Sequence, residues 1–154
     1  MRQRWLPVGV LAGVLFAANV VARLVVRFWF DADPQMQDRL SLAMFVVIGV
    51  VLGSVAFVWG RDRPVERWSG DVAAAILAAL VLTVFVGPFV NGDHPFSAGA
   101  GAFFSQVWLY GGFSIGGVLL GYLVLITLGW DHRSKSLERY AETKLNKPRR
   151  VVRR

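Results

Sequence analysis

The chain has 154 residues, of which 55% are hydrophobic and 18% charged, with a net charge of +7 and a mean hydropathy of +0.51. This composition excludes an ordinary soluble domain and indicates several membrane-spanning segments. Because the chain contains no cysteine, disulfides, thiolate metal sites and thiol redox chemistry are excluded as well. Arginine outnumbers lysine 14 to 3, which is compatible with a GC-rich bacterial genome.

Four stretches reach the roughly 20 apolar residues that a helix needs to cross the hydrocarbon core. They cover about residues 6–30, 40–59, 72–90 and 107–130. We therefore predict an all-α polytopic membrane protein, with four transmembrane helices in a small bundle and a basic tail over residues 131–154. The first stretch follows two arginines and so resembles a signal peptide, but it is longer than a usual signal-peptide core, and we expect it to be retained.

Basic residues are distributed unevenly among the segments outside these spans. Two precede the first span, three lie in the connection after the second span and nine lie in the tail, whereas the first connection has one and the third has none. The positive-inside rule then predicts that both termini and the middle connection are cytoplasmic. Tryptophan prefers the membrane interface, and all six tryptophans lie near predicted span ends: Trp5, Trp29, Trp59, Trp68, Trp108 and Trp130.

Arg23 and Arg27 lie four residues apart, on one face of the first span and toward its outer end. One interpretation places Arg23 near the outer boundary, with its guanidinium reaching the headgroups and with Asp31 and Asp33 nearby as counter-charges. The other keeps Arg23 inside the membrane, where it would need a polar cavity, a partner protein or a lipid phosphate, because the four spans contain no carboxylate. We favour the first interpretation and regard both arginines as candidate functional charges.

Glycines at helical spacing predict faces on which helix backbones can approach closely. These candidate packing residues are Gly9, Gly13, Gly49, Gly53, Gly112, Gly116, Gly117 and Gly121. The fourth span carries two such faces, Gly112 with Gly116 and Gly117 with Gly121. One face would pack within the bundle, and the other could meet another subunit.

The third connection and the tail complete the chain. Residues 91–95 read as an exposed turn in which Asp93 and His94 are too few for a metal site, and residues 97–102 are small and uncharged enough to lie on or dip into the outer leaflet.

In the tail we expect a short amphipathic helix capped by Ser136, with an apolar stripe of Leu137, Tyr140, Ala141 and Leu145, ending at Asn146 and Pro148. The last basic residues form a cluster expected to bind anionic lipid headgroups: Arg149, Arg150, Arg153 and Arg154.

The sequence contains no paired acid and base and no nucleophile beside a base, so we predict no enzymatic activity, no metal and no cofactor. No nucleic-acid motif accompanies the basic tail. We expect an accessory, assembly or scaffolding subunit of the bacterial inner membrane, whose partner is another membrane protein or a second copy. The alternatives are an oligomeric channel or carrier with Arg23 and Arg27 in an outer anion-attracting vestibule, and a phage-type pore former.

Overall fold

The computed structural model describes residues 2–29, 34–90, 92, 94, 96 and 99–145, with side chains described for all of these except 2–4, 26, 27, 29 and 34–38. The described residues are almost entirely helical, and four helical stretches are long and apolar enough to cross a membrane. The predicted all-α class and the predicted number of candidate spans are therefore confirmed.

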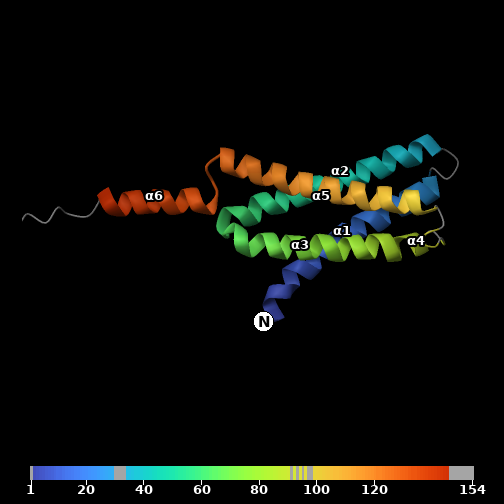
Figure 1. Cartoon of the computed structure of the whole chain (residues 1–154), viewed down its shortest axis with the longest axis horizontal. Coiled ribbons are helices and arrows are strands. Elements are labelled where there is room, and N and C mark those ends of the chain that lie inside the picture. Colours follow the sequence, from blue (N-terminus) through green and yellow to red (C-terminus); the bar gives the residue numbers. More distant parts are fainter. Residues whose placement is uncertain are drawn as a thin grey trace, which may run out of the picture.

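The helices follow one another with short connections (Figure 1). In chain order they are α1 (Arg2–Trp29), α2 (Pro34–Asp62), α3 (Val65–Val81), the π-helical η1 (Leu82–Val86), α4 (Gly87–Val90), α5 (Gly99–Thr127) and α6 (His132–Leu145). The third candidate span consists of α3, η1 and α4, which run without interruption from Val65 to Val90.

Three helices begin well before the spans predicted for them, and the first of these is α2, which begins at Pro34 rather than near residue 40. α3 begins at Val65 rather than near residue 72, because Pro64 has an extended backbone suited to the position before a helix and Glu66 favours the first turn. α5 begins at Gly99 rather than near residue 107. Residues 99–102 of the small, uncharged segment thus form its first turn, and residues 97 and 98 lie outside the described residues. Phe103 stacks on Phe96 beside this turn, with ring centroids 4.9 Å apart.

The fourth span ends before Trp130, which was predicted to be its last residue. α5 ends at Thr127, and Gly129 adopts a positive φ of 68° that residues with a Cβ rarely tolerate. The N–H of Gly129 donates to the Ile126 carbonyl at 2.9 Å and that of Trp130 to the Leu125 carbonyl at 3.2 Å. This is the Schellman pattern of a helix C-terminus, and it turns the chain toward α6.

The prediction that Ser136 caps the tail helix is wrong. α6 begins at His132, and Asp131 caps it, because Asp131 Oδ2 accepts hydrogen bonds from the N–H groups of Arg133 at 3.1 Å and Ser134 at 3.3 Å. Ser136 instead donates its hydroxyl to the Arg133 carbonyl within the helix. Figure 1 shows α6 leading away from the long helices, and its expected apolar stripe is exposed. Asn146 and Pro148 lie outside the described residues.

The long helices form two main pairs, α2 with α5 and α1 with α3. The members of each pair run in the same direction (Figure 1). Fully buried apolar side chains come from all four spans and include Leu15, Ile48, Leu52, Ala75 and Leu125. Large apolar side chains also cover the outside, as expected for helices that meet lipid rather than water.

Candidate functional site

The closest helix contact is made by glycines of α2 and α5. A Cβ added at Gly49 would lie 3.1 Å from the Phe113 carbonyl oxygen, and one added at Gly53 would lie 2.9 Å from the Gly117 carbonyl oxygen. In the opposite direction, a Cβ at Gly117 would collide with the backbone of Gly49, and one at Gly121 with the backbone of Gly53. The two backbones therefore touch directly, which larger residues at Gly117 and Gly121 would prevent.

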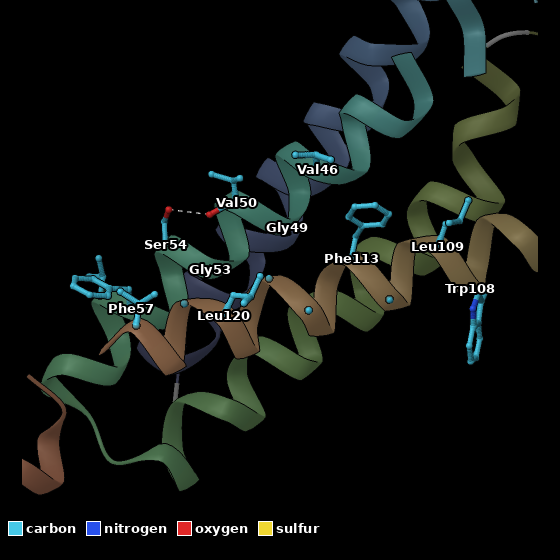
Figure 2. Close-up of a pocket in the computed structure, with 16 residues that line it drawn as sticks. Val46, Gly49, Val50, Gly53, Ser54, Phe57, Trp108, Leu109, Phe113 and Leu120 are labelled. Carbon is cyan, nitrogen blue, oxygen red and sulfur yellow. Dashed lines mark hydrogen bonds between the residues drawn. The ribbon is translucent and has the colours of Figure 1, made fainter. Parts of the chain in front are cut away.

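An apolar groove of about 760 Å³ runs beside this contact, with one wall from α2 and the other from α5 (Figure 2). Val50 and Phe57 belong to the α2 wall, and Trp108 and Leu120 belong to the α5 wall. The hydroxyl of Ser54 also lines the groove, but it donates to the Val50 carbonyl at 2.8 Å within its own helix. The groove thus offers shape and apolar contact with little hydrogen bonding.

Gly112 and Gly116 also line the groove, and the space beside them is open. A Cβ at either position would meet no atom within 4 Å, in contrast to Gly117 and Gly121. α5 therefore carries one glycine face occupied by α2 and a second face whose backbone is accessible from the groove. Gly9 and Gly13 of α1 likewise have open space, but they do not line this groove.

Arg23 is held among other helices. It is half-buried, and its Nε donates to Asn19 Oδ1 at 2.9 Å, while Asn19 Nδ2 donates to Met44 Sδ at 3.1 Å. The guanidinium also lies against Gly87, where an added Cβ would be 3.1 Å from Arg23 Nε. Glycine at that position provides the room for the arginine.

The side chain of Arg27 lies outside the described residues, as do Asp31 and Asp33. Asn19 is fully buried and is the residue that orients Arg23. From the sequence, Asn19 was only one of several polar residues in the spans. Its position four residues before Arg23, on the same helical face, was the available signal.

The π-helical segment η1 lies next to the position that holds Arg23. Pro88 has no N–H to donate, and its ring crowds the preceding turn, so a regular α-helix is disfavoured here. The chain responds with a wider turn in which the Gly87 N–H bonds to the Leu82 carbonyl, five residues earlier. Pro88 thereby accounts for the local geometry that presents Gly87 to Arg23.

Four polar side chains are fully buried in the otherwise apolar interior: Asn19, Thr83, Tyr110 and Ser114. The hydroxyl groups of the last three have no hydrogen-bond partner within the described part of the chain.

The chemistry available to these groups is limited. Hydroxyls and a guanidinium can hold water or an anion, but they provide no acid and base pair for catalysis. Among the described residues, no group of three or more His, Cys, Asp or Glu side chains could hold a metal ion.

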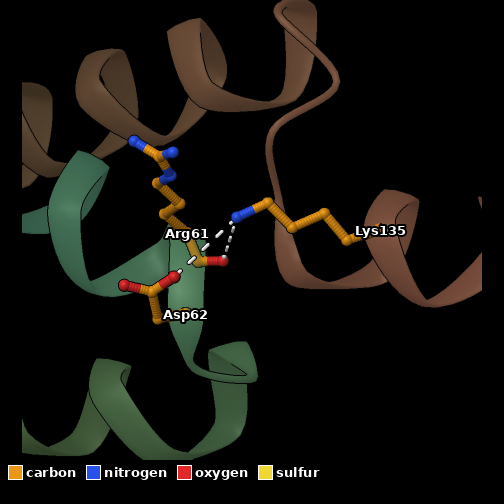
Figure 3. A network of polar contacts seen from close by, with 3 residues as sticks. All are labelled: Arg61, Asp62 and Lys135. Atoms are coloured by element: carbon orange, nitrogen blue, oxygen red, sulfur yellow. Dashed lines mark hydrogen bonds and ion pairs between the residues drawn. The ribbon is translucent and has the colours of Figure 1, made fainter.

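A second polar region lies where α2 ends and α6 begins. Lys135 Nζ donates to the Arg61 carbonyl at 3.2 Å and lies 3.8 Å from Asp62 Oδ1 (Figure 3). The Arg61 guanidinium lies over the Trp130 ring, 5.5 Å from its centroid. These contacts fix the first turn of α6 to the end of α2, so the groups at this end have a defined geometry.

The fold and these sites define a small helical protein with four helices able to span a membrane. Comparisons with protein-family models, with curated proteins and with solved structures found no match to this chain.

Proposed function

We propose that the protein is a non-enzymatic accessory subunit of the bacterial inner membrane, which binds one transmembrane helix of a partner membrane protein in the groove between α2 and α5. The observation that carries this proposal is the open backbone at Gly112 and Gly116 inside an apolar groove. Lipid tails are as apolar as leucine, so helices associate in a membrane mainly where small residues allow close van der Waals packing. Such a contact also permits weak Cα–H···O bonds.

The length of the groove suits a helix. Its α5 wall extends from Trp108 to Val124, which at 1.5 Å per residue corresponds to about 24 Å of a hydrocarbon core of roughly 30 Å. A second copy presenting the same groove would bring two concave surfaces together, and these are not complementary. A helix of a different protein is therefore the favoured occupant.

The distribution of charge supports an orientation with both termini in the cytoplasm. Arg61, Arg63 and Arg67 lie in the α2–α3 turn region, at the same end of the molecule as the contacts of α6. Basic residues are retained on the cytoplasmic side of bacterial membranes. Reporter fusions after Val65 and Gly99 test this orientation, since a cytoplasmic signal from Gly99 contradicts it.

Site-specific photocrosslinking tests the helix-binding function. A crosslinker at Val50, in the groove, should capture a partner through one apolar segment, whereas a crosslinker at Leu77, which is exposed on α3, should not. Replacing Gly112 and Gly116 by leucine fills the groove and should abolish the Val50 product.

The matched control replaces Gly9 and Gly13 by leucine, since these positions are equally open but lie outside the groove. The control should leave the Val50 product unchanged. Crosslinks from Val50 to lipid alone would contradict the proposal, as would conversion or transport of a defined substrate by the purified protein.

The buried polar side chains favour one second candidate, passage of an anion or water through an oligomer. This candidate rests on three buried hydroxyls without described partners and on the half-buried Arg23, which Asn19 holds among the helices. An anion flux in liposomes that disappears in Arg23→Ala, while the circular dichroism and oligomeric state are retained, would support this function. Equal flux in the variant and the original protein would contradict a role for Arg23.

A further inference from the structure

A pocket of about 510 Å³ lies where the α2–α3 turn, the end of α5 and the start of α6 meet. This volume falls within the roughly 300–1,000 Å³ of small-molecule sites. Charged side chains of both signs line the pocket: Arg63, Glu66, Asp131 and Arg133. The formal charges of these two arginines and two carboxylates sum to zero, so the pocket differs from the cluster of arginines over residues 149–154.

Asp131 presents a buried acceptor to this pocket. Its side chain is only 7% exposed; Oδ2 caps α6, whereas Oδ1 has no hydrogen-bond partner in the part of the chain that the structure describes. Hydrogen bonding by the Ser134 side chain, assisted by backbone N–H groups, holds the pKa of Asp131 below its usual value, against the effect of burial. Asp131 is therefore ionised at neutral pH, and a buried carboxylate oxygen without a donor is costly.

A buried donor lies close to the same pocket. The Trp68 side chain is 2% exposed, and its Nε1 has no described acceptor. This nitrogen is 3.6 Å from the position of a Cβ on Gly60, which lines the pocket. The unpaired carboxylate oxygen of Asp131, which lines the pocket, is the atom that a ligand with a donor group would satisfy.

Aromatic side chains place the pocket at the level of lipid headgroups. Tyr122 lines it and packs against Trp68 with ring centroids 5.6 Å apart, while the Arg63 guanidinium lies over the Trp59 ring at 5.3 Å. Tryptophan and tyrosine concentrate at the membrane interface. The pocket therefore lies at the depth that lipid headgroups occupy.

We propose that this pocket binds a phosphate ester bearing a primary ammonium, supplied as the headgroup of phosphatidylethanolamine. The ammonium donates to Asp131 Oδ1, and the phosphate lies against the arginines Arg63 and Arg133. A phosphate carrying no cation would meet the two carboxylates unfavourably, and a choline headgroup has no N–H to donate. The site is independent of the helix groove, so either proposal can fail without the other.

Native mass spectrometry tests the lipid preference. The full chain is released from nanodiscs containing equal amounts of phosphatidylethanolamine, phosphatidylcholine and phosphatidylglycerol, and the retained lipids are identified. Phosphatidylethanolamine should be retained about tenfold over phosphatidylcholine, as expected for one charge-assisted hydrogen bond. Equal retention of all three lipids, or preference for phosphatidylglycerol, overturns the proposal.

The variant Asp131→Asn removes the charge but keeps a good cap for α6, because Asn and Asp are nearly equivalent at this position. It should abolish the preference with α6 still helical by circular dichroism. Glu138→Gln is the matched control, since Glu138 is exposed on α6 and does not line the pocket. A preference that persists in Asp131→Asn, or is lost equally in Glu138→Gln, overturns the assignment of Asp131.

Soluble O-phosphoethanolamine separates the two sources of the same chemistry. The full chain in nanodiscs of phosphatidylcholine alone is mixed with millimolar O-phosphoethanolamine. If the lipid is the ligand, no stoichiometric adduct of the soluble compound is retained. A stoichiometric adduct that disappears in Asp131→Asn would support the same pocket chemistry, but would overturn the lipid as its source.

Discussion

Replacement of Gly117 by alanine should destabilise the protein, whereas replacement of Gly112, little more than one turn away on the same helix, should not. The two positions have the same residue type and similar depth but opposite surroundings. An added Cβ at Gly117 would collide with the Gly49 backbone, while one at Gly112 would meet nothing within 4 Å. The comparison therefore isolates the close contact between α2 and α5.

The magnitude follows from two opposing effects. Alanine is favoured over glycine in a helix interior by up to about 1 kcal/mol at either position. At Gly117 the helices must also separate, and overpacking of this kind costs about 1–3 kcal/mol. If α2 and α5 separate by about 0.5–1 Å, each atom pair across the contact also loses a quarter to a half of its dispersion energy.

We therefore expect Gly117→Ala to lower the free energy of unfolding by about 1–2 kcal/mol. Gly112→Ala should leave it unchanged or raise it by up to about 1 kcal/mol. Unfolding by titration with SDS in mixed micelles, followed by tryptophan fluorescence, measures the difference. Equal midpoints for the two variants would refute the direct backbone contact.

Three further predictions concern individual polar groups. Asn19→Leu should lower the free energy of unfolding by about 1–3 kcal/mol, because Arg23 Nε loses its acceptor, and the same SDS titration measures it. Tyr110→Phe should leave the thermal unfolding temperature unchanged or raise it, because the buried hydroxyl has no partner among the described residues; a clear decrease would indicate a bound water. Asp131→Ala should weaken α6 by about 1 kcal/mol, measured as helicity by circular dichroism, whereas Asp131→Asn should not. Folding lowers the pKa of Asp131, so its charged cap stabilises α6 fully at pH values above 3.8, the usual pKa. This stabilisation is lost as the pH falls below that value. Acid should therefore reduce the helicity of α6 more in the original protein than in Asp131→Asn.

The number of helices able to span a membrane could be predicted from the sequence, because apolar length alone decides whether a helix can cross a membrane. Their ends could not be predicted in the same way, because a helix continues into water wherever its caps allow. α5 starts at Gly99 through aromatic packing with Phe96, and it ends at Thr127 because Gly129 adopts a positive φ. The start of α6 was predicted at the wrong residue, since Asp131 and Ser136 are both good caps by type.

The two glycine faces of α5 were also visible in the sequence, but their roles were not. Which face meets α2 depends on the rotation of α5 about its axis, and this is set by packing with the other helices. The pocket at Asp131 could not be predicted either, because its groups come from segments that are far apart in the chain and meet only when α6 docks on the end of α2.

The pairing of α2 with α5 also sets an order of assembly during synthesis. Gly49 and Gly117 are 68 residues apart (117 − 49), and at about 5–20 residues per second the second glycine follows the first after roughly 3–14 seconds. During that interval the glycine face of α2 has no α5 to cover it and is exposed to lipid or to the insertion machinery. Completion of the groove, which needs walls from both helices, is therefore a late event in the biogenesis of the protein.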